Sequence, residues 1–199
     1  SKKDATKSGE ERIVSDDGTP ESEVHAAINP VDTNNIIISP IKMDPSAVFT
    51  DPSEMMLCPV YYTTDFGQSW EKSSFKNKLK RDDLMPVGGG DPVLVFDNDG
   101  TAYMSWIFLA FKMSGMFNFD STFNTMHWAY STNGGKNWER EDDEYIAHSE
   151  SEFGFSETFG LKNFYDKQWM ASDYSNSKYR GNVYLSLSRL SNETNAAIE

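Results

Sequence analysis

The chain has 199 residues, and its 31 Asp and Glu outweigh its 18 Lys and Arg, which gives a formal net charge of −13. This charge excludes general nucleic-acid binding, which needs clustered cationic side chains, and docking on anionic membranes. Hydrophobic residues make up 38% of the chain, enough for a core, yet no apolar run is long enough to cross a bilayer. The single cysteine, Cys58, excludes an internal disulfide framework and a zinc site built from several cysteines.

The first segment, residues 1–20, is polar and charged. Three interpretations stay open for it: a tail, a linker from a preceding domain, or a strand that completes the domain that follows. The chain begins at Ser1 without a Met and shows no signal-peptide pattern. We therefore expect a processed or trimmed start, from which any targeting segment has already gone.

A strand-like segment then recurs along the chain, at intervals of about 68 residues for the first two copies. Glu23–Asn29 (EVHAAIN) and Asp91–Asp97 (DPVLVFD) each begin with an acid, continue through apolar residues and end in Asn or Asp. The third copy is Lys167–Asp173 (KQWMASD). A second strand that ends in Ser follows each copy after a short turn: Asn35–Ser39, Thr101–Ser105 and Asn182–Ser186.

A tight-turn motif recurs with the same spacing. Thr63–Trp70 reads TTDFGQSW and Ser131–Trp138 reads STNGGKNW. Its Gly supplies the positive φ of a hairpin turn, its Asp or Asn accepts hydrogen bonds from the turn's own amides, and its hydroxyl residue holds the other side. Its Trp packs a large ring beneath the hairpin. These structural roles fall on Thr63, Asp65, Gly67 and Trp70 in the first copy, and on Ser131, Asn133, Gly135 and Trp138 in the second.

The repeating unit is four short strands, and helical periodicity of any length is absent. This pattern is typical of a β-propeller blade, so the sequence predicts an all-β fold. We expect blades at about residues 21–75 and 88–140, and a third that begins at about residue 165. About two and a half blades cannot close a ring, because a propeller needs at least four. Residues 21–199 are therefore predicted to form an incomplete propeller, as a piece of a longer polypeptide or completed by another subunit.

The turn motif resembles the Asp-box, or BNR repeat, of the sialidase superfamily, with Asn133 replacing the Asp in the second copy. The segment Gly88–Trp106 (GGGDPVLVFDNDGTAYMSW) is similar to secreted bacterial sialidase-like proteins with BNR repeats. The resemblance implies a ring of six or seven blades and a secreted or cell-surface location. In this family the Asp-box turns lie on the face opposite the active site, which implies that Asp65 and Asn133 are not catalytic.

On the face opposite the Asp-box turns, the starts of the inner strands are expected to gather charged side chains. Glu23, Asp91 and Lys167 occupy equivalent repeat positions, and His25 and Asp166 are close to them in sequence. Two interpretations stay open. The group binds a polar ligand or performs acid–base chemistry, or its charges only solvate the mouth of a channel.

Two further stretches are expected on that face. The loop Ala110–Asn124 carries several Phe and Met, among them Phe117 and Phe119. They form a contact surface for a sugar or a protein, or they fold into a small cluster of the loop's own. The acidic stretch Glu139–Glu152 has enough carboxylates for Ca²⁺ but lacks the spacing of an EF-hand. We interpret it as a solvated loop and expect neither a metal nor a cofactor.

No catalytic residue follows from the resemblance. Sialidases bind the substrate carboxylate with three Arg and add a Tyr–Glu pair and an Asp acid, whereas no Arg of this chain lies at an equivalent inner-strand position. We expect part of a secreted or cell-surface propeller that binds a glycan or a protein partner. The alternative is part of a sialidase-like glycoside hydrolase whose catalytic residues lie largely outside this segment.

Overall fold

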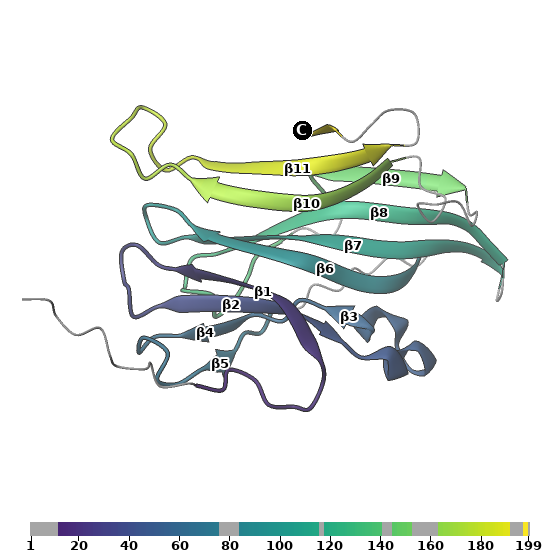
Figure 1. The fold of residues 1–199 in the computed structure, drawn as a ribbon, viewed down its shortest axis with the longest axis horizontal. Coiled ribbons are helices and arrows are strands. Elements are labelled where there is room, and N and C mark those ends of the chain that lie inside the picture. The colour runs from purple at the N-terminus through teal and green to yellow at the C-terminus, as the bar shows by residue number, and fades with distance from the viewer. Residues whose placement is uncertain are drawn as a thin grey trace, which may run out of the picture.

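The structure is a computed structural model that describes residues 12–75, 84–115, 118–140, 145–152, 163–191 and 197–198. Within these ranges the chain forms three antiparallel sheets and two short 3₁₀ helices. Figure 1 shows the sheets following one another, with the inner strands β1, β6 and β10 at corresponding places. The prediction of an all-β, incomplete propeller is confirmed: the three described sheets are successive blades that do not close into a barrel.

The first blade has the strand order β1–β2–β4–β5, and β3 pairs with the end of β2. The connection between β2 and β3 holds the 3₁₀ helices η1 and η2, each begun by an Asp whose carboxylate accepts a backbone N–H two residues on. Each is too short for a helical period to show in the sequence. No helix among the described residues is long and apolar enough to cross a membrane. The elements are β1 (Glu21–Ile28), β2 (Ile36–Met43), η1 (Pro45–Phe49), η2 (Pro52–Glu54), β3 (Met56–Leu57), β4 (Tyr61–Thr63) and β5 (Glu71–Lys72).

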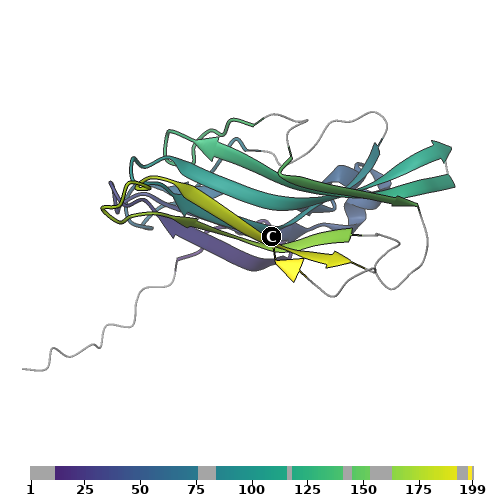
Figure 2. The same cartoon turned by 90° about the horizontal axis from the view of Figure 1, so that it is seen from above.

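The second blade is the complete four-stranded sheet β6–β7–β8–β9, which extends beyond the range 88–140 expected for it. Figure 2 shows its long hairpin, β7 and β8, reaching past the other strands at one end. The prediction of a loop over Ala110–Asn124 is therefore wrong, because these residues pair as strands almost to the hairpin tip. Phe123 is buried there against Phe108 and Ala110. The strands are β6 (Leu84–Phe96), β7 (Ala102–Gly115), β8 (Asn118–Ser131) and β9 (Ala147–Glu152).

The third blade has the order β10–β11–β12. Its first two strands pair over almost their whole length, and a turn from Asp173 to Asn182 joins them. The short β12 adds a third strand that the sequence pattern does not indicate. The strands are β10 (Asn163–Ser172), β11 (Val183–Ser191) and β12 (Ala197–Ile198).

Alternate residues of the second blade's strands point to its two opposite faces, and both faces carry apolar side chains. One face packs against the first blade in a cluster that includes Leu94, Phe96, Met104, Trp106, Ile37 and Val60. The other face packs against the third blade through Val93, Val95 and Met170. Cys58 is fully buried in the first cluster, where burial raises the pKa of its thiol and keeps it protonated. The core therefore lies between blades, as a propeller requires.

The first Asp-box turn is held by its own side chains. Thr63 Oγ1 accepts hydrogen bonds from the backbone N–H groups of Asp65 (3.2 Å) and Gly67 (3.0 Å). The Asp65 carboxylate accepts the Ser69 hydroxyl at 2.6 Å, the Thr63 hydroxyl at 2.7 Å and the backbone N–H of Ser69 at 2.9 Å. These three bonds, that of the Ser69 hydroxyl foremost, lower its pKa to about 2. The second turn repeats the pattern with Ser131 and Asn133 in the same roles.

The second Asp-box turn also packs onto the first blade. Asn35 is buried just before β2, and its Nδ2 donates to the carbonyl oxygen of Gly134 at 3.0 Å. A Cβ atom on Gly135 would lie 2.5 Å from Cγ2 of Ile37, so only glycine fits between the blades. The turn therefore joins blade to blade as well as strand to strand.

Candidate functional site

The inner strands are interrupted by β-bulges at the positions that the repeat makes equivalent. At each bulge one residue other than glycine has a positive φ: 48° at Glu23, 50° at Asp91 and 50° at Lys167. A left-handed conformation costs such a residue about 1–2 kcal/mol, so the fold enforces it three times. Bulges redirect side chains. Asp91 and Lys167 lie well inside β6 and β10 rather than at the strand starts expected from the sequence.

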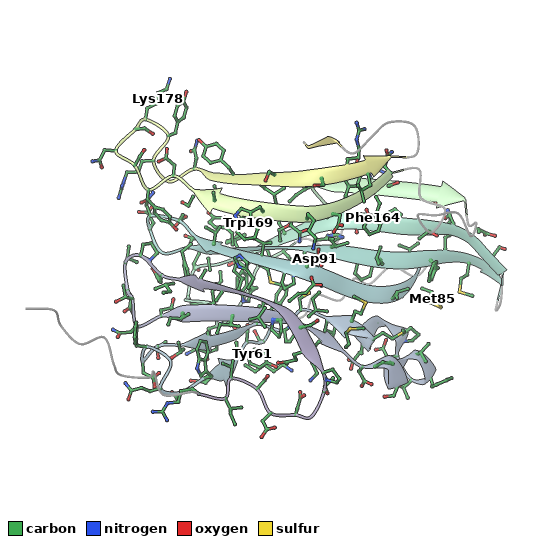
Figure 3. The ribbon with its side chains drawn as sticks, viewed as in Figure 1. Tyr61, Met85, Asp91, Phe164, Trp169 and Lys178 are labelled. Atoms are coloured by element: carbon green, nitrogen blue, oxygen red, sulfur yellow. The ribbon has the colours of Figure 1, made fainter. Side chains whose placement is uncertain are left out.

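The bulges border one shallow depression of about 260 Å³. Its lining draws on all three blades: Glu23 and His25 of β1, Asp91 of β6, and Lys167, Gln168 and Trp169 of β10. Figure 3 shows Asp91 and Trp169 on these neighbouring inner strands. The structure therefore brings together side chains that are far apart in the sequence.

Carboxyl groups outnumber cations around this depression. Lys167 Nζ lies 3.5 Å from Asp91 Oδ2, and the attraction of that carboxylate is the main cause that raises the pKa of Lys167. Asp166, the residue before Lys167, is half-buried. Burial is the largest cause that raises its pKa, and a hydrogen bond and repulsion from Asp91 act in the same direction. One ammonium group is thus attracted by three carboxyl groups, those of Asp91, Asp166 and, most weakly, Glu23.

A histidine and an exposed tryptophan form the apolar part of the site. His25 Nδ1 accepts the backbone N–H of Leu94 at 3.1 Å, which places the proton of the neutral ring on Nε2. Burial lowers the pKa of His25, so the ring is neutral at pH 7. The His25 ring meets that of Trp169 in an edge contact, with centroids 5.3 Å apart. Trp169 is nevertheless 62% exposed, which leaves most of a large ring open to a ligand.

Gln168 is a site residue that the sequence pattern does not single out. It is only 2% exposed, and its Nε2 donates to the backbone carbonyl oxygens of Asp91 and Ser105. Its Oε1 has no hydrogen-bond partner among the described residues. An unpaired buried amide oxygen is costly, which marks this position as unusual. The sequence offers one sign of this role: Gln168 is a polar residue within an otherwise strand-like segment, directly after the charged Lys167.

The other predicted ligand-face residues do not join the depression as the structure describes it. Phe117 lies outside the described residues, as does the side chain of Phe119, whose backbone belongs to β8. Residues 141–144 of the acidic stretch also lie outside them. Among the residues that are described, no group of three or more His, Cys, Asp and Glu could hold a metal ion.

A second cavity, of about 320 Å³, is lined by residues from before β1 to just after β5, among them Lys42, Glu54 and Lys72. The Lys42 ammonium is already paired with the carboxylate of Asp17. No repeat-equivalent positions from different blades meet there, so the bulge depression is the stronger candidate site.

Comparison with known proteins identifies the turns. Residues 61–72 and 129–140 match the model of the BNR/Asp-box repeat, and they contain the two turns described above. The resemblance of these turns to the Asp-box is thereby confirmed. No curated protein sequence matches this chain.

Two solved structures are similar to the chain at low sequence identity. One is the Hadza microbial sialidase Hz136, with a TM-score of 0.48 and 10% identity over 90% of this chain and 31% of that one. The other is a protein of unknown function from Dyadobacter fermentans, with a TM-score of 0.34 and 9% identity over 94% of this chain and 70% of that one. The chain thus spans 31% of the length of the sialidase.

Proposed function

We propose that this chain is part of a secreted or cell-surface Asp-box propeller that binds a glycan in the depression between its inner strands. The observation that carries the proposal is the set of bulges in three successive blades, which border one depression with the side chains of Glu23, Asp91 and Lys167. Backbone strain clusters at functional sites, so its recurrence at equivalent positions supports a binding site here.

The chemistry of the depression suits a sugar. The apolar C–H face of a pyranose ring packs on an exposed aromatic ring, which Trp169 offers. Sugar hydroxyl groups donate to carboxylates and accept from ammonium groups, and Asp91 and Lys167 present both. The volume, about 260 Å³, lies just below the ~300–1,000 Å³ typical of sites for drug-sized ligands, so it suits a single ring.

Isothermal titration calorimetry with a set of neutral and charged oligosaccharides tests this proposal. At least one should bind, and Trp169→Ala should weaken it by about tenfold or more, the size expected when an exposed aromatic platform is lost. Tyr179→Ala is the matched control, because Tyr179 is an exposed aromatic residue in the β10–β11 turn, outside the depression. Equal losses in the two variants, or no binding by any sugar, would refute the glycan site.

A second candidate, part of a glycoside hydrolase, is favoured by Asp166. A carboxyl group with a raised pKa beside a second carboxyl group is the arrangement of an acid catalyst. Under this proposal an aryl glycoside would be hydrolysed, and Asp166→Asn, Glu23→Gln or Asp91→Asn would abolish turnover. Turnover that survives all three substitutions removes these residues from the mechanism, while sugar binding without any turnover favours the binding module.

We also propose that further blades, from the same polypeptide or from another subunit, cover the free faces of the first and third blades. The apolar side chains of Ile28 on β1 and Tyr184 on β11 are exposed. Apolar side chains on the sheet faces that lie between two blades are instead buried in clusters. Light scattering of the purified chain tests this: association with a second polypeptide supports completion by a subunit. A monomer in which the backbone amides of the first and third blades exchange as slowly as those of the second blade would contradict it.

A further inference from the structure

We infer that the depression binds a cationic sugar, one that carries free amino groups, rather than an acidic sugar such as a sialic or uronic acid. The inference deepens the proposed glycan site and rests on it. It follows from three features of the depression: its excess of carboxyl groups, an unpaired buried acceptor, and an open aromatic ring.

The charges of the site select the sign of the ligand. The one ammonium of Lys167 lies 3.5 Å from Asp91, and the carboxyl groups of Asp166 and Glu23 attract it more weakly. A ligand carboxylate would add a fourth acid to a group in which two acids already repel each other. A ligand ammonium would relieve that repulsion and would gain a charge-assisted hydrogen bond.

Two of the described arginines are engaged away from this depression. The Arg180 guanidinium donates to the backbone carbonyls of Tyr174 and Ser175, and that of Arg140 lies over the rings of Phe75 and Trp106. No described Arg lines the depression. The planar bidentate group that best recognises a sugar carboxylate is therefore missing from its described lining.

The buried amide of Gln168 points to a donor on the ligand. Its Oε1 has no described partner, while its Nε2 is used by two backbone carbonyl oxygens. The side chain cannot turn over to offer a donor instead without breaking those two bonds. Because this oxygen is closed to solvent, a ligand reaches it only when the Gln168 side chain shifts; an ammonium or hydroxyl group would then satisfy it, whereas a carboxylate has no proton to give.

The exposed ring of Trp169 adds a third preference in the same direction. Cations are attracted to the face of an indole, and the ring lies beside the acidic residues in the same lining. A sugar that stacks on Trp169 would thus hold a ring ammonium between the indole and the carboxyl groups of Asp91 and Glu23.

The experiment compares three tetrasaccharides by calorimetry at about pH 5.5, where sugar amines are protonated. They are β-1,4-linked glucosamine, its N-acetylated and therefore neutral counterpart, and an oligogalacturonate. The glucosamine tetramer should bind at least about tenfold more tightly than the neutral one, and the galacturonate should show no binding. Raising NaCl from about 0.1 M to 1 M should weaken only the glucosamine tetramer, because the Debye length falls from about 10 Å to 3 Å.

Asp91→Asn tests the charges without removing the shape of the site. It should weaken the glucosamine tetramer about fivefold and the N-acetylated tetramer less, because the neutral sugar loses only a hydrogen-bond acceptor and no opposite charge. Asp99→Asn, in the exposed β6–β7 turn, removes one charge outside the depression and should change neither. Circular dichroism of each variant checks that it remains folded.

The outcomes separate this inference from the proposed function. Galacturonate binding that equals or exceeds glucosamine binding overturns the cationic preference while the glycan site stands. Equal effects of Asp91→Asn and Asp99→Asn overturn it as well, because the charge would then act at long range. Failure of all three sugars to bind overturns the glycan site itself, and the inference with it.

Discussion

Substitution of Glu23 by Gly and by Ala separates the backbone of the bulge from its side chain. Both substitutions remove the same carboxylate, which is exposed. Only glycine adopts the φ of 48° at this position without strain. The two variants therefore differ mainly in the cost of the left-handed conformation.

That cost sets the size of the expected difference. A left-handed backbone costs a residue with a Cβ about 1–2 kcal/mol, and the greater freedom of glycine in the unfolded chain cancels part of the gain. We expect Glu23→Gly to be more stable than Glu23→Ala by about 1 kcal/mol. For a chain of this length, the midpoint of thermal unfolding should differ by about 2–4 °C.

Ala26, an exposed residue of the same strand that is not among those with positive φ, supplies the control. Ala26→Gly should lower stability by about 0.5–1 kcal/mol, the usual cost of glycine inside a strand. The preference between Gly and Ala should thus reverse within three positions of β1. Urea titrations followed by circular dichroism measure both differences. If the Ala variant is more stable than the Gly variant at position 23, as at position 26, the left-handed backbone conformation of Glu23 is contradicted.

Three other predictions concern the blade junction and the acid pair. Asn35→Ala removes the side-chain donor to the carbonyl oxygens of Gly134 and Thr63 and the acceptor for Asn29 Nδ2, and should cost about 1–3 kcal/mol in urea unfolding; a neutral result would show that these bonds, the one between blades included, add no stability. Gly135→Ala should destabilise by about 1–3 kcal/mol more than Gly67→Ala, because only the first presses a Cβ into another blade; equal losses in thermal unfolding would contradict this packing. The raised pKa of Asp166 means that the native state loses stability as pH rises through the range between its unfolded and folded values. Asp166→Asn should therefore be more stable than the parent at pH 7, with the advantage gone by about pH 3; urea titrations that show the opposite trend would refute the assignment.

The repeat itself makes much of the fold predictable. Trp70 and Trp138 follow the same turn residues at the same spacing, so the hairpins and the blade pattern are written in local sequence. The β7–β8 hairpin replaces the predicted loop, because its several Phe and Met residues suggest a contact surface on a loop. Phe111 and Met113 nevertheless keep the period of two that characterises a strand.

The site was predictable only as a set of equivalent positions. Glu23, Asp91 and Lys167 occupy equivalent positions of the repeat. None of them is glycine, the residue that ordinarily signals a left-handed bulge. Such a conformation is imposed by tertiary contacts, which local propensity does not encode. The roles of Gln168 and Asn35 depend on groups from other blades and could not be read from their own segments.

Mapping of amide and indole NMR shifts during a titration with the glucosamine tetramer tests most directly whether the three bulges form one binding site. The largest shifts should fall on the amides of Glu23, Asp91 and Gln168 and on the indole N–H of Trp169, which lie on three different blades. Shifts confined to the β7–β8 hairpin, or to a single blade, would contradict a site shared by the inner strands.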